Sequence, residues 1–111
     1  MVEIEFDQGN VDFASIVSDQ NASFALVEIW RECVSNAVRH GLASKVSISL
    51  HQENGYITSV IANNGLQPDK SISRSLGSTI LDDLSTEWWF DLPPNKSQLV
   101  EVHCKVILAG A

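Results

Sequence analysis

Apolar residues alternate with acidic ones over residues 2–7, which predicts a half-buried strand at the start of the chain. Apolar residues then recur at three- and four-residue steps from about Ala22 to His40, as in a long amphipathic helix. Two further alternating segments, residues 45–51 and 56–62, flank Asn54-Gly55, a pair that supplies the positive φ angles of a tight turn. The first half of the chain therefore predicts a strand, a helix and a hairpin.

The second half of the chain returns to these patterns after an irregular segment. Residues 66–76 have no apolar period and are rich in serine, proline and aspartate, so we expect a loop. A helix is predicted from Gly77 to about Ser85, followed by strands over residues 87–92 and 98–108. Between the first strand and the long helix, residues 11–17 suit either a short helix or an irregular packed segment.

This order of elements predicts an α+β fold. The strands carry one clear apolar face each, as an antiparallel sheet covered on one side does. We expect a two-layer α/β sandwich with a mixed, mostly antiparallel sheet covered on one face by helices. Trp88 and Trp89 are adjacent in one predicted strand, so their side chains point to opposite faces and one of them belongs to the core.

Length and charge narrow the class of protein. We expect residues 1–111 to form one domain, as a fragment of a longer chain. The net charge of −7 argues against a nucleic acid bound through many phosphates, although one nucleotide could be held locally. No stretch has the length of a transmembrane helix and the start lacks a signal-peptide pattern, so we expect no direct membrane contact. A cytoplasmic location follows, which the cytoplasmic part of a membrane sensor would share. Cys33 and Cys104 lie in apolar-periodic segments and are expected to be reduced core residues.

A polar stripe runs along the end of the predicted long helix. Glu32, Asn36 and His40 are spaced at four-residue steps, so they lie one turn apart on the same face, with Arg39 beside them. A carboxylate, an amide and an imidazole in register could hold a metal ion and a phosphate tail, or could be an ordinary solvated face. Gly41 stands where a helix often ends in a left-handed cap.

Two glycine-containing breaks follow downstream, at the ends of predicted elements. Asn63-Asn64-Gly65 comes directly after the second hairpin strand, and Ser75-Leu76-Gly77-Ser78 lies at the start of the helix predicted to end near Ser85. A glycine turn that leads into a helix offers unpaired backbone N–H groups to a phosphate. His51 and His103 lie on predicted strands, where spacing and neighbours predict neither a metal site nor a phosphoacceptor.

Together, in this order, these features resemble the GHKL ATPase superfamily, which includes the histidine kinases. The run Glu32–Gly41 is similar to the asparagine box of that superfamily, Glu-x-x-x-Asn-Ala-x-Arg-His-Gly. Asn63-Asn64-Gly65-Leu66-Gln67 resembles its first glycine box, and residues 75–81 resemble its second. The resemblance covers nearly the whole chain and implies the histidine-kinase ATPase fold.

The resemblance also implies a role for each site residue, with ATP and Mg²⁺ as ligands. Asn36 would coordinate the Mg²⁺ that bridges the phosphates, and Glu32 would act as the catalytic base or orient the nucleophile. Arg39 and His40 would contact phosphates. The glycine boxes would complete the nucleotide site through Asn63, Gly65, Leu76, Gly77, Ser78 and Thr79.

The chain departs from the family pattern at three positions. Asn63 replaces the aspartate that accepts a hydrogen bond from the adenine amino group; its side-chain oxygen could accept the same bond without a charge. Gln67 and Ser75 replace glycines, which restricts positive φ angles and close backbone approach to the ligand.

The implied function is the ATP-binding catalytic domain of a two-component sensor histidine kinase, which donates a γ-phosphoryl group to a histidine on a separate domain. Its partners would be a dimerisation and phosphoacceptor domain and a response regulator, and the full-length protein would be a homodimer. An anti-sigma-type serine kinase of the same fold is an alternative. A degenerate, non-catalytic module for docking or dimerisation is a third, and an unrelated α/β sandwich a fourth.

Overall fold

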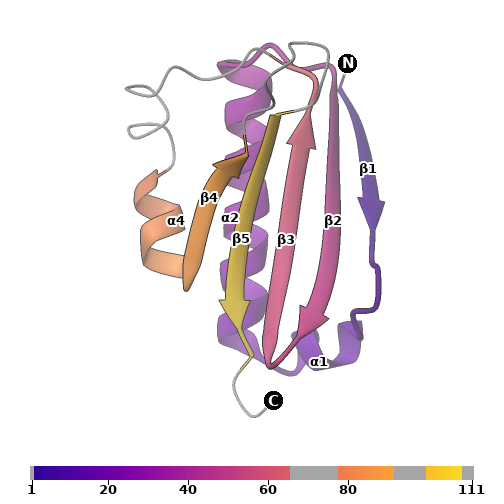
Figure 1. The fold of residues 1–111 in the computed structure, drawn as a ribbon, viewed down its shortest axis with the longest axis vertical. Helices are drawn as coiled ribbons and strands as arrows, with labels where there is room; N and C mark the ends of the chain where they lie inside the picture. The colour runs from indigo at the N-terminus through magenta and orange to yellow at the C-terminus, as the bar shows by residue number, and fades with distance from the viewer. Residues whose placement is uncertain (1, 66–77, 92–99, 109–111) are drawn as a thin grey trace.

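The computed structural model describes residues 2–65, 78–91 and 100–108, which form five strands and three helices around one core. Figure 1 shows their arrangement. In chain order the elements are β1 (Glu3–Asp7), α1 (Phe13–Val17), α2 (Gln20–Arg39), β2 (Lys45–Glu53), β3 (Tyr56–Asn63), α4 (Ser78–Leu84), β4 (Glu87–Asp91) and β5 (Val100–Ile107).

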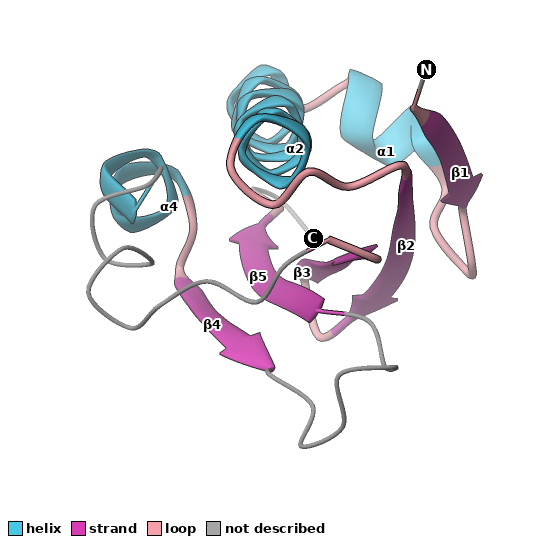
Figure 2. Cartoon of the chain, turned by 90° about the horizontal axis from the view of Figure 1, so that it is seen from above, coloured by secondary structure: helices cyan, strands magenta, loops and turns pink. Residues whose placement is uncertain are grey.

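The strands form a single mixed sheet in the order β1-β2-β3-β5-β4. β1 pairs with β2 in parallel, and the other three pairings are antiparallel. Figure 2 shows the helices gathered on one side of this sheet. The hairpin turns at Asn54 and Gly55 with φ angles of 53° and 79°, as their sequence predicts. The predicted fold class is confirmed: an α+β sandwich of two layers with a mostly antiparallel sheet.

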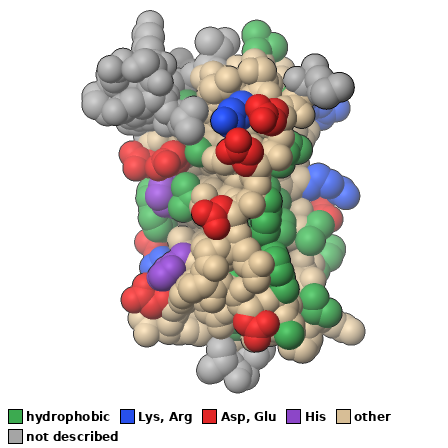
Figure 3. All heavy atoms as spheres, turned by 90° about the vertical axis from the view of Figure 1, so that its right-hand side faces the viewer, with side chains coloured by type: hydrophobic (Ala, Val, Ile, Leu, Met, Phe, Trp, Pro, Cys, Tyr) green, Lys and Arg blue, Asp and Glu red, His purple; other side chains and the backbone are tan. Residues whose placement is uncertain are grey.

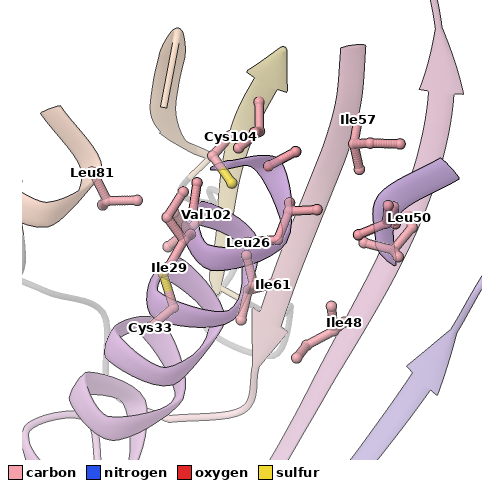
Figure 4. Packing of buried hydrophobic residues seen from close by; sticks show 14 of the residues in the cluster. Leu26, Ile29, Cys33, Ile48, Leu50, Ile57, Ile61, Leu81, Val102 and Cys104 are labelled. Carbon is pink, nitrogen blue, oxygen red and sulfur yellow. The ribbon is translucent and has the colours of Figure 1, made fainter. Parts of the chain in front are cut away.

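Helix α2 supplies the helical side of the core. Its buried side chains recur at three- and four-residue steps and include Leu26, Ile29 and Cys33, which Figure 4 shows directed at the sheet. Burying a side chain such as Leu26 contributes about 1.5–3 kcal/mol relative to leaving it exposed. The helix begins two residues earlier than predicted, because the Asp19 carboxylate accepts a hydrogen bond of 3.0 Å from the Ala22 backbone N–H and caps it.

The end of α2 corrects one expectation. Gly41 does not adopt the left-handed conformation; Leu42 does, with a φ of 55°. The glycine is needed for space instead, because an added Cβ would lie 2.8 Å from the Ala37 carbonyl oxygen. The helix ends at the C-cap His40, and the Ala43 backbone N–H donates back to Ala37 at 2.9 Å. Close packing of the chain over the last turn therefore explains this glycine.

Strand β1 forms as predicted, but its apolar side is open rather than buried. Ile4 and Phe6 face the helical layer and are still 55% and 45% exposed. Phe6 contacts the rings of Phe13, at a centroid distance of 5.9 Å, and Trp30, at 5.5 Å. Because β1 is an edge strand and α1 has only five residues, the helices do not cover it.

The remaining elements follow the sequence pattern. The segment at residues 11–17 contains a short helix, α1, capped by the Asp12 carboxylate. Trp88 packs against the core, and Trp89 on the opposite face is 38% exposed. Cys33 and Cys104 are free and buried, as expected of core residues. In the part of the chain that the structure describes, no helix is long and apolar enough to cross a membrane.

Candidate functional site

Glu32 and Asn36 lie on the flank of α2 that faces away from β1. Each residue turns a helix by about 100°, so Glu32 lies to one side of the buried Cys33 and Trp30 lies to the other. Trp30 faces β1 through its contact with Phe6. Figure 2 shows α4 on the side of α2 opposite α1 and β1. The carboxylate and the amide therefore occupy the flank that α4 adjoins.

The side chains of the stripe have no partner within the described residues. Glu32 and Asn36 are half-buried, whereas Arg39 and His40 are exposed. None of the four makes a hydrogen bond or ion pair with another described side chain. The neighbouring Arg31 differs, since it pairs with a carboxylate one turn earlier at 3.7 Å. The donors and acceptors of the stripe are thus available to a ligand.

The end of β3 holds the second predicted part of the site. Asn63 is 8% exposed and faces the helical layer, and its Oδ1 accepts a hydrogen bond of 2.8 Å from the Gly65 backbone N–H. The side chain of the next residue, Asn64, holds the turn in place. Its Oδ1 accepts hydrogen bonds from the backbone N–H groups of Ser44 and Lys45, both at 3.0 Å. These bonds anchor the end of β3 to the start of β2.

A close backbone contact brings the two parts together. A Cβ added to Gly65 would lie 2.5 Å from the carbonyl oxygen of Gly41, so the chain after β3 touches the chain after α2. Only glycine allows this approach. The chain just after the stripe and the Asn63–Gly65 turn therefore meet at one end of the molecule, although they are far apart in the sequence.

Only part of the second glycine box lies among the residues that the structure describes. Leu76 and Gly77, like Gln67 and Ser75, lie outside the described residues. Ser78 begins α4, and Thr79 is exposed in its first turn. The helix that this box should precede is therefore present, and the contacts of the box itself stay a prediction.

Two buried thiols lie beneath the stripe. Burial raises the pKa of the Cys33 thiol strongly, and the neighbouring Cys104 and Glu32 add to that rise. Burial also raises the pKa of Cys104 to about 11, although hydrogen bonds from Ser59 oppose the change. A thiolate is the nucleophilic form of cysteine, so neither residue is suited to catalysis near neutral pH. Ser59 also accepts a hydrogen bond of 3.0 Å from the Trp30 indole N–H.

Neither the role of Asn64 nor the surroundings of His103 were predicted from the sequence. The signal for Asn64 was present, because asparagine before glycine commonly bonds nearby backbone in turns. The sequence predicted no metal site at His103, yet the structure places the carboxylates of Asp91 and Glu101 beside it. That grouping depends on the register of β4 and β5, which no local pattern reveals.

No protein-family model and no curated protein matches the sequence. Among solved structures, the chain is similar to the Acinetobacter baumannii histidine kinase AdeS, with a TM-score of 0.57 and 15% identity over 98% of this chain. It is also similar to the mycobacterial sensor histidine kinase MprB, with a TM-score of 0.50 and 13% identity over 94% of this chain. The chain spans 55% of the first structure and 81% of the second.

These likenesses define the class of fold. At 13–15% identity they bear on architecture and not on activity. The chain has the histidine-kinase-like α/β fold that the resemblance of its motifs predicts.

Proposed function

We propose that this chain is the ATP-binding catalytic domain of a two-component sensor histidine kinase. In this proposal it binds Mg-ATP between the end of α2 and the turn after β3. It would donate the γ-phosphoryl group to a histidine on a separate dimerisation and phosphoacceptor domain, from which a response regulator would receive it.

One observation carries the proposal: the Gly41–Gly65 contact joins the two elements that hold the predicted nucleotide-binding residues. The half-buried Asn36 amide, which has no partner among the described residues, supports it further. An amide oxygen is a hard, neutral ligand of the kind that Mg²⁺ accepts alongside water and phosphate oxygens. The Asn36 amide therefore fits the metal ion of Mg-ATP.

Each side chain of the stripe has a separate role in this proposal. Asn36 would hold the metal ion, whose charge offsets that of the phosphates. Glu32, one helical turn away on the same flank, would accept a proton or orient the attacking group. Arg39 and His40, exposed at the end of α2, would donate hydrogen bonds to phosphate oxygens. Transfer of a phosphoryl group needs mainly such positioning and charge neutralisation.

Calorimetric titration with Mg-ADP tests the proposal. We expect saturable binding to the wild-type chain and a dissociation constant raised at least about tenfold by Asn36→Ala, equivalent to about 1.4 kcal/mol. Asn21→Ala is the matched control, since Asn21 is an exposed amide on the same helix, about 22 Å away. No heat and no thermal shift at millimolar Mg-ADP would sink the proposal.

A degenerate docking module is the second candidate, favoured by two observations. The Asn63 oxygen that would receive adenine already accepts a bond from Gly65. In addition, an apolar strip made of Ile4, Phe6, Phe13 and Val27 is exposed on β1, α1 and α2. Figure 3 shows hydrophobic side chains in a band on this face, beside a column of carboxylates.

The occupant of that strip, in our proposal, is a helix of the dimerisation and phosphoacceptor domain. The acidic β1 side chains next to the strip favour a helix with basic flanks, because opposite charges speed and orient docking. Val27→Glu, at a side chain 51% exposed, should abolish co-purification with that domain and leave Mg-ADP binding intact. If every activity of the full-length protein survived Asn36→Ala and failed with Val27→Glu, the docking module would replace the kinase proposal.

A further inference from the structure

Three potential metal ligands converge on the sheet face that points away from α2. Asp91 ends β4 and pairs across the sheet with Glu101 on β5, and His103 follows two residues later on the same face. The core-facing residues of β5 alternate with these two, so both point outward. The ligand atoms of the three side chains all lie within 4.8 Å of one another. We refer to these three residues as the β4–β5 cluster.

The imidazole distinguishes this cluster from an ordinary acidic surface. His103 Nε2 lies 3.1 Å from Glu101 Oε1 and 3.9 Å from Asp91 Oδ2, so one nitrogen faces both carboxylates. The ring stacks on Trp89 with a centroid distance of 5.0 Å and an interplanar angle of 14°, and its side chain is 20% exposed. The ligand nitrogen is therefore held in place before any ion arrives.

We propose that the β4–β5 cluster binds a divalent transition-metal ion of the zinc class. In a tetrahedral site with metal–ligand distances of about 2.0–2.2 Å, neighbouring ligand atoms are about 3.3–3.6 Å apart. The separations of 3.1 and 3.9 Å between Nε2 and the two carboxylates bracket that value, and all the ligand atoms lie within 4.8 Å, so side-chain rotations would complete the site. Two carboxylates and a neutral imidazole carry a charge of −2, which a divalent ion neutralises.

The chemistry of the ligands sets the choice of ion. An imidazole nitrogen suits zinc, cobalt and nickel, whereas Mg²⁺ and Ca²⁺ prefer oxygen ligands alone. The metal would take the Nε2 lone pair in place of the contact of 3.1 Å between Nε2 and Glu101 Oε1. Three protein ligands leave a fourth position for water. The cluster lies on the opposite sheet face from Asn36, so it is independent of the proposed nucleotide site.

Zinc chloride and cobalt chloride, titrated into the whole chain by calorimetry, test the proposal. We expect one ion per chain, no displacement by millimolar Mg²⁺, and binding weakened at least about tenfold in His103→Ala. His51→Ala is the matched control, because His51 pairs with a single carboxylate, Glu53, at 3.3 Å on the same face. Asp91→Asn changes a side chain 62% exposed and keeps its shape, so it separates loss of the site from loss of the fold.

Three outcomes would overturn the proposal. Absence of zinc binding to the wild-type chain is the first, and equal loss of binding in His103→Ala and His51→Ala is the second. The third is a thiolate-to-cobalt charge-transfer band, which would place the ion at the buried cysteines instead. Binding that is weakened by Asp91→Asn, unchanged by His51→Ala and free of such a band would support it.

Discussion

Replacement of Asn63 by aspartate should strengthen adenine-nucleotide binding. Asn63 Oδ1 accepts a hydrogen bond of 2.8 Å from the Gly65 backbone N–H. The polar group of Asn63 that is left for a ligand is therefore its side-chain NH₂, which is a donor. An adenine amino group is also a donor, and two donors do not pair. In Asn63→Asp one carboxylate oxygen keeps the bond to Gly65 and the second becomes an acceptor for the adenine amino group.

The size of the effect follows from the charge of the new acceptor. A hydrogen bond to a charged group contributes about 1.5–3 kcal/mol. Because the wild-type amide makes no bond to the adenine amino group, this whole contribution is gained, which corresponds to binding about 10- to 150-fold tighter. Asn63 is 8% exposed, so a buried carboxylate should also lower the stability of the ligand-free domain.

Calorimetry with Mg-ADP and Mg-GDP measures this prediction. Guanine presents an acceptor where adenine presents its amino group, so Asn63→Asp should tighten Mg-ADP alone. Asn64→Asp is the matched control: it adds the same charge one residue later, where the side chain holds Ser44 and Lys45 instead. Unchanged or weaker Mg-ADP binding in a folded Asn63→Asp variant would refute the assignment of Asn63 to adenine.

Three further predictions concern the packing around the site. Gly65→Ala places a Cβ 2.5 Å from the Gly41 carbonyl oxygen, and we expect about 1–3 kcal/mol lower stability in urea unfolding together with weaker Mg-ADP binding. Folding raises the pKa of Cys104 from 9.0 to about 11, so the protonated thiol stabilises the folded state below pH 9. This contribution to the free energy of unfolding should be lost as pH rises from 9 to 11, which urea unfolding across that range would measure. Trp30→Phe removes the indole N–H that donates to the fully buried Ser59 hydroxyl and should lower the free energy of unfolding by about 1–2 kcal/mol. The same substitution should have a smaller effect in a chain that already carries Ser59→Ala.

Local signals in the sequence were enough to predict most of the architecture. The period of α2 and the Asn54-Gly55 turn each fix a structure within a few residues, because helices and tight turns depend on neighbours in the chain. The alternation in β5 likewise predicted the buried face that packs under α2. The stripe of Glu32 and Asn36 was found in the same way.

Contacts between distant segments could not be predicted. The apolar residues of β1 indicated burial, but whether a helix covers an edge strand depends on helix placement, and Phe6 is left 45% exposed. A left-handed cap is the common reason for a glycine after a helix, but Gly41 is constrained by crowding against the Ala37 carbonyl and by the approach of Gly65. The β4–β5 cluster similarly depends on the strand register that sets Asp91 opposite Glu101.

The central claim is that a nucleotide binds where the end of α2 meets the turn after β3. Amide chemical shifts of the ¹⁵N-labelled chain, followed by NMR during titration with Mg-ADP, test it most directly. We expect saturating shifts at Gly41 and Gly65 and at the side-chain amide of Asn36, with Asn21 unaffected. Absence of shifts at millimolar Mg-ADP, or shifts confined to residues far from Gly65, would contradict it.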